Sequence, residues 1–199
     1  MAPKTLYNYT HKFDILDRNF AHTIFINDFN ELYMQVLDCL HEFELTKTEI
    51  CAPGGNESGI PKKIKNFFIS RGWLDEYKFE MKKTINGVVQ ESSSYKIDLY
   101  HPKAKIAFDV EWNSKDSVFN RDLSNFRILH ENNAIDLAII FTRTHEGIMS
   151  IAREHNLHGK YGASTTNMTK LREKLELGIL GKCPLLAIGI DRGCYNGNL

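Results

Sequence analysis

The sequence lacks the features that define several classes of protein, beginning with paired cysteines and long apolar segments. Its four cysteines stand far apart and form no CxxC pair: Cys39, Cys51, Cys183 and Cys194. We therefore expect no zinc site, and we expect reduced thiols, as in an intracellular, cytoplasmic protein. No apolar run reaches the ~18 residues that a membrane span needs, and the N-terminus has no apolar segment of the secretory type. Neither a membrane partner nor export is expected.

Charge of one sign is also not in excess, because 25 Lys and Arg residues balance 25 Asp and Glu residues. This balance argues against a non-specific coat protein for nucleic acids, which would be strongly basic. It permits an enzyme that meets DNA on one local basic face. The eight histidines show no HExxH or related spacing, so a histidine-based metal site has no support. No motif for an organic cofactor is present either.

Hydrophobic periodicity predicts an α/β fold with a mixed central β-sheet flanked by helices. Helices are predicted at 28–44, 60–71 and 117–130, and a further short helix ends near residue 177. Strands are predicted at 76–84, 92–100, 104–112, 134–143 and 185–190, with Asn86-Gly87 as a hairpin turn between the first two. The apolar centre of 134–143 is typical of a strand covered on both faces. With 42% hydrophobic residues and no low-complexity linker, residues 1–199 are expected to form a single domain.

The most informative stretch carries carboxylates at the ends of two predicted strands. If these strands form a hairpin, Asp98 lies near the strand end that carries Glu111, and Asn113 shares a face with Glu111. Two carboxylates in close contact repel each other unless a cation lies between them, and oxygen ligands of this kind suit Mg²⁺. The carbonyl of Trp112 is a further candidate ligand, and Asp109 is a rival for either carboxylate. A solvated turn or surface pair is the alternative interpretation.

Asp98, twelve intervening residues and then Glu111-Trp112-Asn113 resemble the PD-(D/E)XK nuclease motif. Type II restriction enzymes of the BglII/BstYI group have Glu-x-Gln there, and Asn is the shorter homologue of Gln. Three further blocks are similar to that group, namely KNFFISRGW, KYGASTTNMTKL and GKCPLLAIGI. The resemblance implies a restriction-endonuclease-like fold, Mg²⁺ (with Mn²⁺ as a substitute) on Asp98 and Glu111, and a homodimer that cuts a palindrome. It also implies an N-terminal helical part (1–50), a catalytic core (51–143) and a C-terminal part with recognition loops (144–199).

Asn113 departs from the usual motif, in which a Lys stands at this position. An amide can only orient water or hydrogen-bond a phosphate, so Lys115 is a candidate for the missing cation, with a solvated turn lysine as the alternative. Glu57 opens the 60–71 helix and is either a third acidic residue of the site or a residue favoured by the helix dipole. The polar face of that helix is expected to carry Lys62, Lys63 and Lys65. If Glu57 joins the site, these lysines would lie near the phosphates, with Lys62 as the candidate for contact; a solvated lysine face is the alternative.

Two C-terminal segments contain candidate DNA contacts. The turn at 160–168 concentrates short donors and acceptors that suit phosphates and base edges, although one of its hydroxyl groups is also expected to cap the following helix. Arg192, after the last strand, is able to form two hydrogen bonds to guanine. The candidates from these segments are Lys160, Ser164, Thr165, Thr166, Asn167 and Arg192.

The sequence therefore favours a Mg²⁺-dependent, sequence-specific endonuclease for double-stranded DNA, a type II restriction enzyme. A repair or recombination nuclease of the same fold is one alternative, because a fold does not determine biological function. A DNA-binding module with a decayed active site is another, and Asn113 is the observation that favours it.

Overall fold

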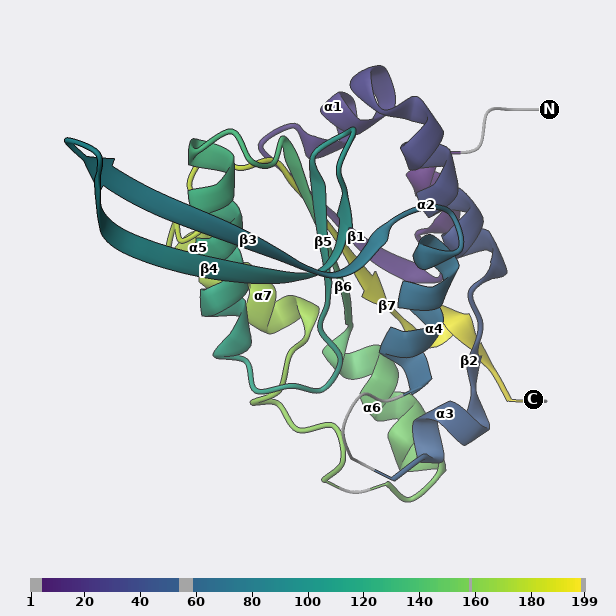
Figure 1. Cartoon of the computed structure of the whole chain (residues 1–199). Helices are drawn as coiled ribbons and strands as arrows, with labels where there is room; N and C mark the ends of the chain where they lie inside the picture. Colours follow the sequence, from purple (N-terminus) through teal and green to yellow (C-terminus); the bar gives the residue numbers. More distant parts are fainter. Residues whose placement is uncertain (1–4, 54–58, 158, 198–199) are drawn as a thin grey trace.

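The computed structural model describes residues 5–53, 59–157 and 159–197. Its centre is a six-stranded mixed sheet with the strand order β1-β7-β6-β5-β4-β3 (Figure 1). Strands β5, β6 and β7 run parallel, and β1, β4 and β3 pair in antiparallel fashion with their neighbours. The bounds are β1 Phe13–Arg18, β3 Leu74–Ile85, β4 Val88–His101, β5 Ile106–Val110, β6 Leu137–Arg143 and β7 Leu185–Ile190.

Two apolar cores cover the two faces of this sheet, as expected for strands buried on both sides. One core joins the sheet to α1 (Ala21–Asp28), α2 (Asn30–Glu42), α3 (Lys47–Cys51), α4 (Gly59–Ile69) and α6 (His145–Glu154). The other joins it to α5 (Val118–Glu131) and α7 (Met168–Glu176). A short parallel pair, β2 (Leu45–Thr46) and β8 (Tyr195–Asn196), lies apart from the main sheet. The predicted α/β fold with a mixed central sheet is confirmed.

The hairpin of β3 and β4 extends well beyond the body of the molecule (Figure 1). Its turn is the predicted Asn-Gly pair, with φ of 50° at Asn86 and 80° at Gly87, the left-handed values that a type I′ hairpin turn requires. The far half of both strands is exposed, whereas Ile97, Leu99 and Tyr100 near the sheet are buried. The hairpin therefore presents its base, where Asp98 lies, to the body of the protein.

Most of the predicted elements are present, with corrected boundaries. The predicted helix at 28–44 is α2, preceded by the unpredicted α1, and β4 begins at Val88 rather than at residue 92. Strand β5 ends at Val110 rather than at residue 112, a correction that affects the site. Strand β1 and helix α6 were not predicted from the sequence. Among the described residues, no helix is long and apolar enough to cross a membrane.

Candidate active site

The antiparallel pairing of β4 with β5 brings two of the predicted carboxylates together. Leu99 is the partner of Phe108 in this pair, so Asp98 and Asp109 come next along the two strands. The backbone N–H of Asp98 donates to Oδ1 of Asp109 at 2.8 Å, and the N–H of Val110 donates to Oδ2 of Asp98 at 2.9 Å. These two bonds orient both carboxylates at the base of the hairpin and confirm that the strands pair as predicted.

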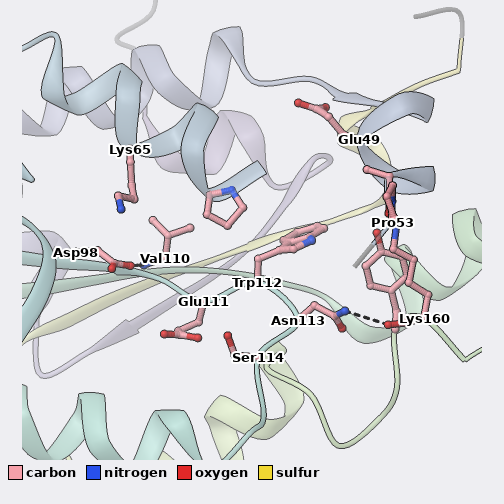
Figure 2. Close-up of a pocket in the computed structure, with 13 residues that line it drawn as sticks. Glu49, Pro53, Lys65, Asp98, Val110, Glu111, Trp112, Asn113, Ser114 and Lys160 are labelled. Carbon is pink, nitrogen blue, oxygen red and sulfur yellow. Dashed lines mark hydrogen bonds between the residues drawn. The ribbon is translucent and has the colours of Figure 1, made fainter. Parts of the chain in front are cut away.

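Glu111 follows the end of β5 and remains attached to the sheet. Its N–H donates to the carbonyl of Phe141 in β6 at 2.8 Å, which places its side chain beside Asp98 at the rim of a pocket (Figure 2). Only 7% of Glu111 is exposed, and its buried Oε2 has no hydrogen-bond partner among the residues that the structure describes. A buried carboxylate oxygen without a partner is costly, so this atom is placed to accept a ligand.

A fourth acidic residue, Asp122 of α5, contributes to the negative charge around Glu111. It is 1% exposed, and Arg121 binds it at 2.8 Å and approaches Glu111 at 3.8 Å. Burial first, and the charge of Asp122 second, raise the pKa of Glu111 to about 8. Burial also raises the pKa of Asp122 to about 6, against the lowering effect of Arg121, and raises the pKa of Asp109. The site therefore holds more negative charge than its neighbouring cations offset.

These features fit a divalent cation, because the unpartnered Oε2 and the raised pKa of Glu111 both favour a bound positive charge. Among the described residues, no group of three or more His, Cys, Asp and Glu side chains is arranged to hold a metal ion. Mg²⁺ typically takes one or two protein carboxylates and completes its shell with water and phosphate. Asp98 and Glu111, with the carbonyl of Trp112, a pocket-lining residue, remain the predicted ligand set.

Asn113 lines the same pocket, but its side chain points away from Glu111 (Figure 2). The backbone of Asn113 has a φ of 60°, a conformation that Asn tolerates better than most residues, and it lies beyond the end of β5. Its Nδ2 donates to the carbonyl of Lys160 at 3.0 Å. The prediction that Asn113 and Glu111 project from one face of a strand was therefore wrong, because the strand ends first.

The predicted basic and acidic residues differ in whether they line this pocket. Lys62 is exposed on α4, and Lys115 is exposed and forms an isolated backbone bridge with Thr165. Glu57 lies outside the described residues. Lys65 is 6% exposed and lines the pocket, so its expected place on the polar face of the helix was wrong.

The 160–167 segment is held to the protein by hydrogen bonds of its own side chains. The ammonium of Lys160 donates to the carbonyls of Ile50 and Ala52, and burial lowers the pKa of Lys160. Thr166 accepts from the N–H of Ser114 at 3.1 Å.

The cap of α7 is Asn167, which accepts from the N–H of Lys170 at 3.1 Å. The expected hydroxyl cap was wrong, because Thr165 instead accepts from the fully buried Arg143 at 2.6 Å. Ser164 is exposed. Arg192 pairs with Glu154 at 2.6 Å and donates to Ser150. DNA contacts by these residues stay predictions.

Asp122 and Arg143 were not recognised as site or loop-anchoring residues from the sequence, and Lys65 was expected on the polar face of its helix. For Lys65 and Asp122 a signal of burial nevertheless exists. Pro61, Ile64, Lys65 and Phe68 have the spacing of one buried helix face, and Lys65 is the charged member of that set. Asp122 similarly lies among the buried residues Phe119, Leu123 and Phe126 of α5. A charged residue that falls within the apolar spacing of a helix thus indicates a buried charged side chain.

A mixed sheet covered by helices on both faces, with clustered carboxylates at the end of one hairpin, defines a restriction-endonuclease-like protein. The chain matches the family described as Restriction endonuclease BglII/BglIII over residues 13–190 and belongs to that family. Its members are site-specific deoxyribonucleases, so DNA is the substrate and the chain is a DNA-binding hydrolase. No curated protein matches the chain closely enough to count as a relative.

Proposed function

We propose that the protein is a Mg²⁺-dependent type II restriction endonuclease that hydrolyses both strands of a short palindromic DNA site. The observation that carries the metal dependence is the buried, unpartnered Oε2 of Glu111 in a pocket that Asp98 also lines. Family membership supports the substrate class. Mn²⁺ is expected to replace Mg²⁺, since both ions prefer oxygen ligands.

In this proposal Asp98, Glu111 and the carbonyl of Trp112 hold the metal. A metal held by these residues would supply the positive charge that polarises the phosphodiester, orients water and stabilises the leaving oxygen. Two hydrogen bonds within the chain orient Asp98. The carboxylate of Asp109 accepts from the N–H of Asp98, and the N–H of Val110 donates to the carboxylate of Asp98. Asn113 keeps its role as a pocket residue that binds the backbone of residue 160.

A homodimer is proposed because the described residues of one chain form one such site, and a double-strand break needs two hydrolytic events on antiparallel strands. A two-fold dimer places one site at each strand, and its symmetry demands a symmetric target. The proposed DNA contacts are polar or basic side chains on α4, on the segments near the pocket and after β7: Lys62, Lys115, Lys160, Ser164, Thr165, Thr166, Asn167 and Arg192.

The test is cleavage of phage DNA by the purified protein with Mg²⁺, with Mn²⁺ and with excess EDTA. We expect discrete fragments with either metal and none with EDTA. Asp98→Ala and Glu111→Ala are each expected to slow cleavage by at least about 100-fold, the cost of removing one group that stabilises the transition state. Binding in Ca²⁺ should be largely retained in these variants, because phosphate contacts made elsewhere supply most of the affinity.

Other results would point to other functions. A smear would indicate a non-specific nuclease, and binding without cleavage under any metal would indicate a DNA-binding module. Full activity in EDTA would refute the metal dependence. Light scattering with and without a cognate duplex tests the assembly, and a monomer that cuts an asymmetric site would contradict the dimer.

A further inference from the structure

Lys65 occupies a position in α4 that a lysine rarely takes. It shares the buried face of the helix with Pro61, Ile64 and Phe68, and only 6% of it is exposed. A buried ammonium loses its hydration and persists only where negative groups surround it. Burying the positive charge of Lys65 therefore carries a substantial desolvation cost.

The surroundings of Lys65 lie on two sides. On one side its ammonium pairs with Asp75 of β3 at 3.4 Å, where the Asp75 side chain is 47% exposed. On the other side it lines the pocket that Asp98 and Glu111 also line. Figure 2 shows the side chain descending from α4 towards Asp98.

The residues of the motif contribute no positive side chain to the pocket, although its buried carboxylates carry excess negative charge. Asn113 has no charge, and its amide nitrogen already binds the carbonyl of Lys160. Lys115 is exposed and is not among the described residues that line the pocket. Of the described residues that do line it, the two with positive side chains are Lys65 and Lys160. Figure 2 shows Lys65 on the Asp98 side of the pocket and Lys160 beyond Asn113. A further cation, Arg121 of α5, approaches Glu111 at 3.8 Å and binds Asp122 at 2.8 Å, but its side chain is 64% exposed. Lys65 is therefore the buried cation on the Asp98 side.

We propose that Lys65 is a catalytic residue whose ammonium donates a hydrogen bond to a non-bridging oxygen of the phosphate that is cut. The inference rests on the proposed function of the same site. In the reaction, water forms a new P–O bond and the P–O bond to the leaving sugar oxygen breaks. The water proton passes to solvent and the leaving oxygen takes a proton from solvent, so Lys65 stays protonated throughout. A fixed cation of this kind stabilises the negative charge that develops on the phosphate.

The alternative role for Lys65 is structural, as the partner of Asp75, and the two roles predict different results. If Lys65 acts on the phosphate, Lys65→Met removes the charge at nearly constant volume and Lys65→Arg keeps the charge. Asp75→Asn removes the ion pair but leaves the lysine in the pocket. Lys63→Met, in the same helix, removes an exposed lysine that pairs with Glu49 at 3.1 Å, and serves as the matched control.

The experiment uses a duplex that contains the cleavage site, identified from the phage DNA fragments. It measures single-turnover cleavage of this duplex, binding of the same duplex in Ca²⁺, and thermal unfolding of the protein. We expect Lys65→Met to lower the maximal rate by about 100-fold or more, as for removal of an oxyanion donor, with binding changed less than fivefold. Lys65→Arg should recover at least about tenfold of that loss. Asp75→Asn and Lys63→Met should cleave within threefold of the wild type.

Two outcomes would overturn the proposal. One is a Lys65→Met variant that cleaves within threefold of the wild type. The other is an equal loss of rate and melting temperature in Lys65→Met and Asp75→Asn, which would make the role structural. If Lys65→Met does not fold, Lys65→Gln replaces it with the same thresholds. A wild-type protein without metal-dependent cleavage refutes the proposed function instead, and is recognised before any variant is made.

Discussion

Glu111→Gln is expected to stabilise the metal-free protein at pH 8 while abolishing its activity. The pKa of Glu111 is raised from 4.5 to about 8, chiefly by burial. A carboxyl group with a raised folded-state pKa binds its proton more tightly in the folded than in the unfolded protein. The stability it contributes as a neutral acid is thus full below pH 4.5 and is lost as the pH rises towards 8.

The size of the effect follows from this shift. Each pKa unit corresponds to ~1.4 kcal/mol, so the ionised carboxylate costs at most about 4 kcal/mol at pH 8 and under about 1 kcal/mol at pH 5. The pKa values of Asp122 and Asp109 are also raised, so these groups share protons with Glu111. This sharing reduces the cost of ionising Glu111, and we expect Glu111→Gln to gain about 2 kcal/mol of stability at pH 8.

Unfolding by urea in EDTA at pH 5 and pH 8 measures this free energy directly. Glu131→Gln, which removes a 60% exposed carboxylate of α5, is the control and should change stability by less than about 0.5 kcal/mol at either pH. Mg²⁺ should then stabilise the wild type at pH 8 but not Glu111→Gln. The reasoning is refuted if Glu111→Gln is as stable as the wild type, or less stable, at pH 8.

Three further expectations follow from the same contacts. Mg²⁺ affinity of the wild type, measured by calorimetry, should rise between pH 6 and pH 8 because Glu111 must lose its proton to bind the ion; a flat profile would contradict this. Asn167→Ala should lower the free energy of unfolding by about 1–2 kcal/mol through loss of the α7 cap, and an unchanged value would show that the cap is replaceable. Lys160→Met should lower the melting temperature, because the Lys160 ammonium binds the carbonyls of Ile50 and Ala52. The same variant should bind all DNA sequences more weakly and with a smaller salt dependence. Weaker binding to one sequence alone would contradict a phosphate contact.

The hairpin that carries the candidate site could be predicted from local patterns, but the geometry of the site could not. The hairpin that joins β4 and β5 was visible in the sequence as two apolar segments with a turn between them. The register was not visible, because several residues separate the strands and a shift of one residue turns every side chain to the opposite face of the sheet. The pairing of Leu99 with Phe108 decides that Asp98 meets Asp109, and the end of β5 at Val110 decides that Asn113 points elsewhere.

The burial of Lys65 and Asp122 was not predicted, for a different reason. Both lie at core-facing positions of amphipathic helices, where single charged residues are easily assigned to the opposite face. Their importance depends on the sheet edge that each helix covers, which is a long-range property of the fold. The helix α6 was missed because only Ile148, Ile151 and Ala152 mark its buried face, too few for a clear helical period.

The most direct test of the metal assignment is the location of Mn²⁺ in crystals of the protein by anomalous scattering. The account predicts an ion bound between the carboxylates of Asp98 and Glu111, and loss of that ion in the Asp98→Ala protein. Mn²⁺ bound at another group of residues, or a site that stays empty at saturating Mn²⁺ with DNA bound, would contradict it.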